Sequence, residues 1–189
     1  MTEVSSLTGR LLVATPALAD PNFDRAVVLL LDHDEEGSLG VVLNRPTPVD
    51  VGDILEGWAD LAGEPGVVFQ GGPVSLDSAL GVAVIPGDDE RETPLGWRRV
   101  HGAIGLVDLE APPELLAAAL GSLRIFAGYS GWGPGQLEDE LTDGAWYVVE
   151  SEPGDVSATR PEGLWRAVLR RQRGELAMVA TYPDDPSLN

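Results

Sequence analysis

Short apolar runs separated by glycine and proline are the feature that most limits how this chain can fold. They cover Leu11 to Ala14, Ala26 to Leu31, Leu39 to Leu43, Val67 to Gln70 and Leu80 to Ile85. Apolar runs of this length, bounded by turn-forming residues, are typical of β-strands. In a surface helix, by contrast, apolar residues recur every three or four positions over a longer segment. We therefore expect each of these runs to form a strand.

The second and third runs are joined by Asp32 to Gly37, a polar segment that ends in glycine. Such a connection favours a hairpin turn, which makes the two strands antiparallel neighbours. The segment also resembles the first half of a calcium-binding loop, but Leu43 stands where such a loop places a bidentate glutamate. A solvated hairpin turn is the better interpretation.

The second half of the chain mixes strands with helices. Arg124 to Ala127 and Trp146 to Val149 have strand character, and Gln136 to Leu141 is expected to be a short helix. Thr159 and Glu162 have the spacing of a capping box at the start of a further helix. The inward face of that helix consists of Leu164, Trp165, Val168 and Leu169. This mixture predicts an α+β domain, and 189 residues with 43% hydrophobic content suit a single domain over residues 1–189.

The composition excludes several kinds of chemistry. All 12 basic residues are arginine, there is no cysteine, and the formal net charge is −19. Without lysine there is no Schiff base and no P-loop lysine, and without cysteine there is no disulfide, thiol nucleophile or thiolate metal site. No apolar stretch approaches the ~20 residues that span a bilayer. The apolar run near the N-terminus has neither the basic start nor the length of an export signal. We expect a soluble, cytoplasmic protein with no cofactor and no membrane contact.

The segment from residue 128 to 140 departs furthest from ordinary globular composition. Its four glycines are interleaved with Tyr129 and Trp132, and Gln136 and Glu138 follow. Glycine permits positive φ and close backbone approach, so we interpret the segment as a glycine-rich loop. It is either a tight packed turn in which Trp132 fills a core gap, or a pocket for a neutral or cationic ligand. In that pocket Tyr129 and Trp132 form the walls, and Gln136 or Glu138 provides polar contact. A phosphate site is disfavoured, because a proline removes one amide donor and the acids that follow repel phosphate.

Two further patterns carry less weight. Ser130 begins like the nucleophile elbow of serine hydrolases, but Trp132 stands where the elbow requires glycine, so no serine triad is assigned there. Arg45 follows a predicted strand and can pair with Asp20 or Asp24. An ion pair that fixes loop geometry is favoured for Arg45 over an anion-binding role.

One cluster of basic residues lies near the C-terminus. The cluster consists of Arg166, Arg170, Arg171 and Arg173. Contact with DNA through this cluster has to overcome the net charge of −19, and the sequence has no clear helix-turn-helix pattern around it. Direct nucleic-acid binding is not expected.

Several motifs together resemble the YqgE/AlgH family of small bacterial proteins. They are Gly9 to Ala14 with Pro16, Asp20-Pro21-x-Phe23-x-Arg25, His33, Gly37 to Pro46, Gly71 to Val74 and residues 128–140, closing with Trp146 and Trp165. The resemblance implies that family's fold, an α+β domain whose curved, bifurcated, largely antiparallel sheet forms a pseudo-barrel with peripheral helices. Family members are often labelled transcriptional regulators. The resemblance brings no catalytic residues with it.

These observations favour a non-enzymatic cytosolic binding or regulatory protein whose partner is a small molecule or another protein. The candidate binding residues are Tyr129, Trp132, Gln136, Glu138, Asn44, Arg45, Gly71, Gly72 and Asp20. The alternative is an enzyme that acts on a small molecule, with or without metal assistance, through carboxylates such as Asp20 or Glu138 beside the glycine-rich segment. No catalytic or metal-binding residues are assigned.

Overall fold

One long strand, β9 (Ser122–Trp132), organises the molecule, because three other strands pair with it. The computed structural model describes residues 6–18, 20–87 and 94–181. The other strands are β1 (Leu11–Ala14), β2 (Val27–Asp34), β3 (Gly37–Val42), β4 (Pro46–Asp50), β5 (Val67–Gln70), β6 (Val74–Val84), β7 (Trp97–His101), β8 (Ile104–Val107) and β10 (Trp146–Val149). The helices are α1 (Val51–Ile54), α2 (Glu114–Ala117), α3 (Gln136–Thr142), α4 (Pro153–Val156), α5 (Leu164–Arg170) and α6 (Glu175–Val179), with 3-10 turns at Glu56–Leu61 and Pro161–Gly163.

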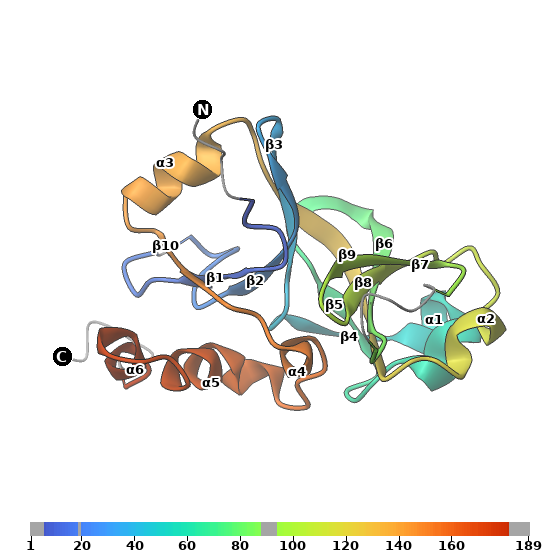
Figure 1. Cartoon of the computed structure of the whole chain (residues 1–189). Coiled ribbons are helices and arrows are strands. Elements are labelled where there is room, and N and C mark those ends of the chain that lie inside the picture. The colour runs from blue at the N-terminus through green and yellow to red at the C-terminus, as the bar shows by residue number, and fades with distance from the viewer. Residues whose placement is uncertain (1–5, 19, 88–93, 182–189) are drawn as a thin grey trace.

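Within the described residues the strands form one ten-stranded sheet. Eight strands follow the order β10-β1-β2-β3-β9-β6-β8-β7, and β5 pairs with β9 off this path and with β4 on its other side. Strand β6 pairs with one edge of β9. On the other edge, β5 pairs with the middle of β9 and β3 pairs with its C-terminal end. The β5 pairing is parallel and includes Phe69 opposite Phe126, whereas the β3 pairing is antiparallel and includes Gly40 opposite Ser130. The sheet therefore divides beside β9, and Figure 1 shows it curling into two halves with the helices outside. The predicted bifurcated, largely antiparallel α+β fold is confirmed.

The division of the sheet depends on two glycines at which backbones nearly touch. A Cβ atom on Gly72 would lie 2.2 Å from the carbonyl carbon of Tyr129, and one on Gly128 would lie 2.7 Å from the carbonyl oxygen of Gly72. Gly128 also has a φ of +73°, which L side chains rarely adopt. Only glycine fits at this crossing of β9 with the segment that leaves β5.

The predicted glycine-rich loop is wrong for its first part. Residues 128–132 continue β9, with Tyr129 paired to Val74 and Trp132 paired to Ser38. Pairing on both edges overrides the weak intrinsic strand preference of glycine. The turn is confined to residues 133–135, and the predicted short helix after it is confirmed as α3.

The C-terminal helices α4, α5 and α6 lie in a row below the half of the sheet that contains β1 and β2 (Figure 1). The predicted inward face of α5 is confirmed, since all its members are buried: Leu164, Trp165, Val168 and Leu169. The predicted capping box at Thr159 is wrong, because α5 begins after a 3-10 turn and has no side-chain cap. A capping box instead joins Glu152 and Asp155 at the start of α4.

Arg124 connects the sheet to the C-terminal segment. Its side chain lies over the ring of Phe69, and Nη2 donates hydrogen bonds to the carbonyl oxygens of Glu64 and Ala158 at 3.0 and 2.9 Å. Burial lowers the pKa of Arg124 to about 10, because the charged guanidinium loses its hydration.

No helix among the described residues is long and apolar enough to cross a membrane.

Candidate functional site

Trp132 lies largely buried in an aromatic cluster. Its side chain is buried, with 6% exposed, and packs against Phe23 and Trp146 at centroid distances of 6.3 and 6.2 Å. The indole nitrogens of Trp132 and Trp146 both donate to Oε1 of Glu140, at 3.1 and 3.0 Å. These contacts give Trp132 a packing role, the first of the two interpretations of its segment.

Gln136 joins the same network at the start of α3. Its Nε2 donates to Oε2 of Glu140, and its Oε1 accepts from the backbone N–H of Gly133, both at 3.0 Å. Both ends of the amide are thus hydrogen-bonded within the chain. Glu140, which the sequence analysis did not single out, is the common acceptor that holds α3 against β9 and β10.

Replacing Glu140 by glutamine is expected to lower the free energy of unfolding by about 1–2 kcal/mol, because the charged acceptor shared by two indoles is lost. Urea denaturation followed by tryptophan fluorescence measures this change. The matched control is Asp139→Asn on the exposed side of α3, expected to stay within about 0.5 kcal/mol of the parent. Equal stability of Glu140→Gln and the parent contradicts the role given to this carboxylate.

The other predicted residues around α3 and β9 also have partners inside the molecule. Oε1 of Glu138 lies 3.2 Å from Nε2 of the buried His33. Tyr129 is partly buried and packs against the largest core cluster. Asn44 is buried against the segment that leads into β2: its Oδ1 accepts from Val27 N, and its Nδ2 donates to the carbonyl oxygen of Arg25.

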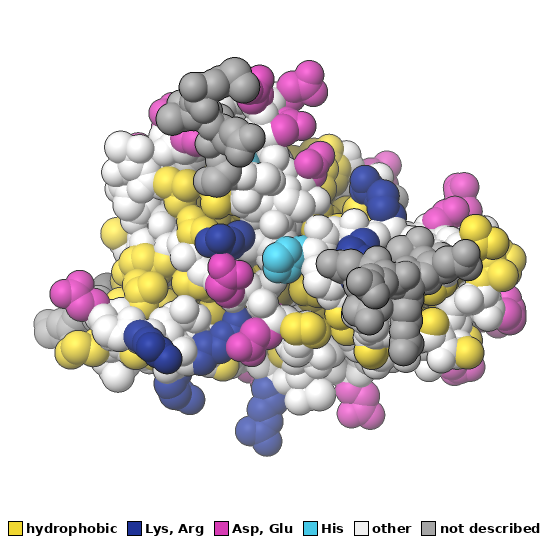
Figure 2. Space-filling model, in the orientation of Figure 1, with side chains coloured by type: hydrophobic (Ala, Val, Ile, Leu, Met, Phe, Trp, Pro, Cys, Tyr) yellow, Lys and Arg dark blue, Asp and Glu magenta, His cyan; other side chains and the backbone are white. Residues whose placement is uncertain are grey.

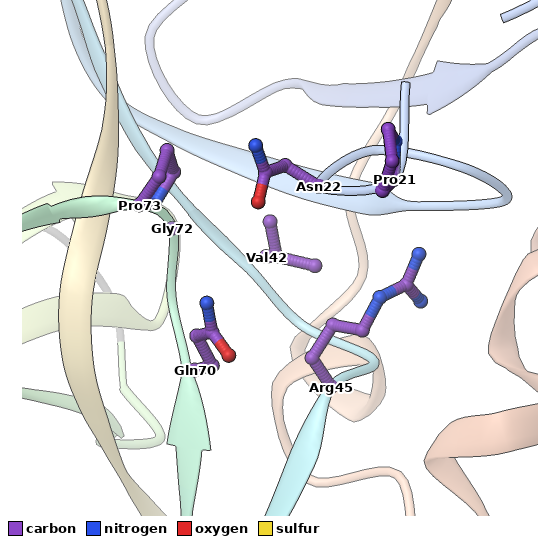
Figure 3. A pocket seen from close by; sticks show the side chains of 7 residues that line it. All are labelled: Pro21, Asn22, Val42, Arg45, Gln70, Gly72 and Pro73. Atoms are coloured by element: carbon purple, nitrogen blue, oxygen red, sulfur yellow. The ribbon is translucent and has the colours of Figure 1, made fainter. Parts of the chain in front are cut away.

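Arg45 and Gly72 do come together, at a small cavity of about 130 Å³. Its lining residues are Pro21, Asn22, Val42, Arg45, Gln70, Gly72 and Pro73, and we call it the Arg45 pocket. Figure 3 shows Val42 in the middle, with the polar ends of Asn22, Gln70 and Arg45 arranged around it from three separate segments. None of the lining residues is acidic, although the chain carries 31 acidic residues.

The guanidinium of Arg45 is held in place by backbone carbonyls. Nη1 donates to the carbonyl oxygen of Asn44 at 3.4 Å, and Nη2 donates to that of Asp24. Partial burial lowers the pKa of Arg45, and the nearby Asp24 carboxylate counters part of that shift. A guanidinium has five N–H donors, so these two bonds leave others for a ligand.

The remaining predicted residues support the walls of the Arg45 pocket. Oδ1 of Asp20 accepts from the backbone N–H of Asn22 at 2.8 Å, a local turn that shapes the loop between β1 and β2. Gly71 crosses β9 without a side chain; its N–H donates to Ala127 and its carbonyl oxygen accepts from Val42. Of the nine predicted residues, the structure brings Arg45 and Gly72 together as lining residues of this pocket, and the other seven do not line it.

The sequence analysis missed Asn22 and Gln70 as pocket residues. Each stands directly beside a residue or motif that it did single out, since Asn22 follows Pro21 and Gln70 precedes Gly71.

Among the described residues, no group of three or more His, Cys, Asp or Glu could hold a metal ion.

Comparison with known proteins gives consistent matches over nearly the whole chain. A protein-family model described as AlgH-like matches residues 11–177. A UPF0301 protein of Streptomyces avermitilis is 90% identical over 100% of this chain and 98% of its own length, and one of Thermobifida fusca is 51% identical over 97% and 96%. A crystal structure from Corynebacterium diphtheriae, 32% identical, superposes with a TM-score of 0.88 over 96% of this chain and 95% of that chain. The solution structure of the AlgH protein from Pseudomonas aeruginosa, 28% identical, gives 0.64 over 97% of both chains.

Proposed function

We propose that this chain, which belongs to the AlgH-like family, is a cytoplasmic binding protein that recognises a carboxylate group in the Arg45 pocket. The carboxylate belongs either to a small molecule or to an acidic side chain of a partner protein. Any regulatory role then follows from this binding rather than from contact with DNA. A cytoplasmic location is in keeping with a sequence that contains no cysteine.

The observation that carries the proposal is the chemistry of the pocket lining. A partly desolvated guanidinium lies beside two side-chain amides, and no carboxylate lines the cavity. Arginine presents parallel N–H groups that match the two oxygens of a carboxylate, and burial strengthens that interaction. A cavity of about 130 Å³ admits a group of the size of acetate or one acidic side chain.

The arginines near the C-terminus support the view that DNA is not the partner. Both Nη atoms of Arg171 donate to the Asp155 carboxylate, at 2.6 and 2.7 Å, and Arg166 lies over the ring of Trp165. Acidic side chains are interspersed with arginines on the face shown in Figure 2, so no large basic surface forms on that face. Neutralising phosphates requires several unengaged cations along one surface.

The test is a calorimetric titration of the purified protein. The ligands are acetate, succinate and a short peptide that contains one glutamate. We expect a dissociation constant of about 1 mM for acetate, because a ligand with so few atoms cannot bind much more tightly. Arg45→Gln is expected to weaken binding at least about tenfold, the effect of losing ~1.4 kcal/mol from a charged hydrogen bond.

The exposed Arg170→Gln is the matched control and is expected to bind acetate as the parent does. Because Arg45 also holds two loops, Asn22→Ala serves as a second pocket variant, expected to weaken binding without altering those carbonyl contacts. Tighter binding of the peptide than of acetate assigns the carboxylate to a protein partner. Unchanged affinity in both Arg45→Gln and Asn22→Ala contradicts the proposal.

A further inference from the structure

A second concavity, of about 230 Å³, lies at the hairpin that joins β2 to β3. Its lining residues are Asp32, Asp34, Glu36, Gly37, Ser38, Leu39 and Trp132, and none of them lines the Arg45 pocket. The acids Asp32, Asp34 and Glu36 are exposed, whereas Ser38 is 9% exposed. The concavity thus combines an acidic rim with one shielded hydroxyl group.

Ser38 is part of a hydrogen-bonded relay that includes a buried imidazole. Its Oγ lies 2.6 Å from Nδ1 of His33, the residue directly opposite it across the hairpin. Nε2 of His33 lies 3.2 Å from Oε1 of Glu138, which extends from the first turn of α3. The imidazole side chain is 2% exposed, so its two ring nitrogens are directed to these two partners rather than to water.

The two partners of His33 determine which of its ring nitrogens carries the hydrogen. A carboxylate only accepts hydrogen bonds, so in the uncharged imidazole Nε2 carries the hydrogen and donates it to Glu138. Nδ1 is then the acceptor, and the Ser38 hydroxyl donates to it. This is the order of hydroxyl, base and orienting carboxylate that activates a serine for nucleophilic attack, here built on strands β2 and β3 and helix α3.

We infer that Ser38 is a nucleophile for acyl transfer, with His33 as its general base and Glu138 as a positioning residue. In the first step Ser38 Oγ forms a bond to the carbonyl carbon of the substrate, and its proton moves to Nδ1 of His33. The bond to the leaving alcohol or amine then breaks, and the leaving group takes that proton. Water then gives a proton to His33 and attacks the acyl carbon; the bond from that carbon to Ser38 Oγ breaks, Oγ takes the proton from His33, and the carboxylic acid leaves.

The acidic rim determines the class of substrate. Asp32, Asp34 and Glu36 repel anionic acyl groups and attract a positive charge, and the net charge of −19 adds to that attraction over longer distances. The fitting substrate is a small ester or amide that carries an ammonium group. This activity is separate from the carboxylate binding proposed for the Arg45 pocket, because the two sites share no lining residue.

The test uses a fluorophosphonate, which a nucleophilic serine attacks at phosphorus with loss of fluoride. We expect one adduct per chain, mapped to Ser38 by peptide mass spectrometry, and none in Ser38→Ala. Ser130→Ala is the matched control: that hydroxyl is fully buried and donates to the carbonyl oxygen of Gly71, so its removal leaves labelling unchanged. Absence of an adduct at Ser38 in the folded parent, or an adduct that persists in Ser38→Ala, overturns the inference.

The positioning role of Glu138 has its own readout. In Glu138→Gln the labelling rate at Ser38 is expected to fall on the order of 10²-fold, because the protonated imidazole loses its charged partner. Glu138 is half exposed, so the unfolding midpoint is expected to stay close to that of the parent. An unchanged labelling rate in Glu138→Gln overturns the assigned relay.

The substrate class is tested with a cationic ester and its anionic counterpart. Faster hydrolysis of the cationic ester, absent in Ser38→Ala, supports the class; the reverse preference contradicts it.

Discussion

Gly72→Ala is expected to lower the free energy of unfolding by more than about 4 kcal/mol, or to prevent folding. The added Cβ would lie 2.2 Å from the carbonyl carbon and oxygen of Tyr129 and 2.4 Å from Oγ of Ser130. Two of these atoms are backbone of the central strand β9, so the strand itself has to move. Because the sheet divides at this crossing, such a movement disrupts the pairing of β9 with β3 and β6.

Chemical denaturation of Gly72→Ala beside Gly66→Ala measures this effect. Gly66 precedes β5, and a Cβ there meets no atom within 4 Å. We expect the control to stay within about 0.5 kcal/mol of the parent, or to gain slightly because alanine restricts the unfolded chain. A Gly72→Ala protein as stable as Gly66→Ala contradicts the description of the crossing.

Trp132→Ala is expected to cost about 3–5 kcal/mol of unfolding free energy, the range for removing a buried aromatic side chain. The change leaves a cavity between Phe23 and Trp146 and removes one hydrogen bond to Glu140. Trp132→Phe keeps most of the ring volume and loses the indole N–H, so it is expected to cost about 1–2 kcal/mol.

Urea denaturation of both Trp132 variants, with Leu115→Ala as a half-exposed control, distinguishes packing from ligand contact. A packing residue gives the graded loss of stability described above. If Trp132→Ala kept the stability of the parent, the residue would not belong to a closed cluster, and a ligand-binding role beside α3 would gain support.

The sequence predicted three short strands with the bounds that they have in the structure. Leu11 to Ala14, Val67 to Gln70 and Trp146 to Val149 form strands with those bounds. The sequence did not predict β4, because Pro46 and Pro48 argue against a strand. Proline is tolerated there because β4 lies at an edge of the sheet. Patterns within one segment identify strands, but they do not show which edge of the sheet a segment will occupy.

The same limit explains the outcome for the candidate site. Glycines at 128 and 131 indicated a glycine-rich loop, whereas the contacts that make this segment a strand come from Val74 and Ser38–Gly40, far away in the sequence. Arg45 and Gly72 were both singled out, and the fold brings them to one pocket. The pocket residues Asn22 and Gln70 gave no chemical signal of their own, since exposed amides are common in turns and at strand ends.

The central claim is that carboxylate recognition takes place at the Arg45 pocket and not along residues 128–140. Two-dimensional ¹H–¹⁵N NMR of the labelled protein during titration with acetate tests it most directly. We expect the largest shift changes at Asn22, Arg45, Gln70 and Gly72, saturating together, and their loss in Arg45→Gln. Changes centred on Trp132, Gln136 and Glu138, or no saturable change anywhere in the spectrum, would contradict the claim.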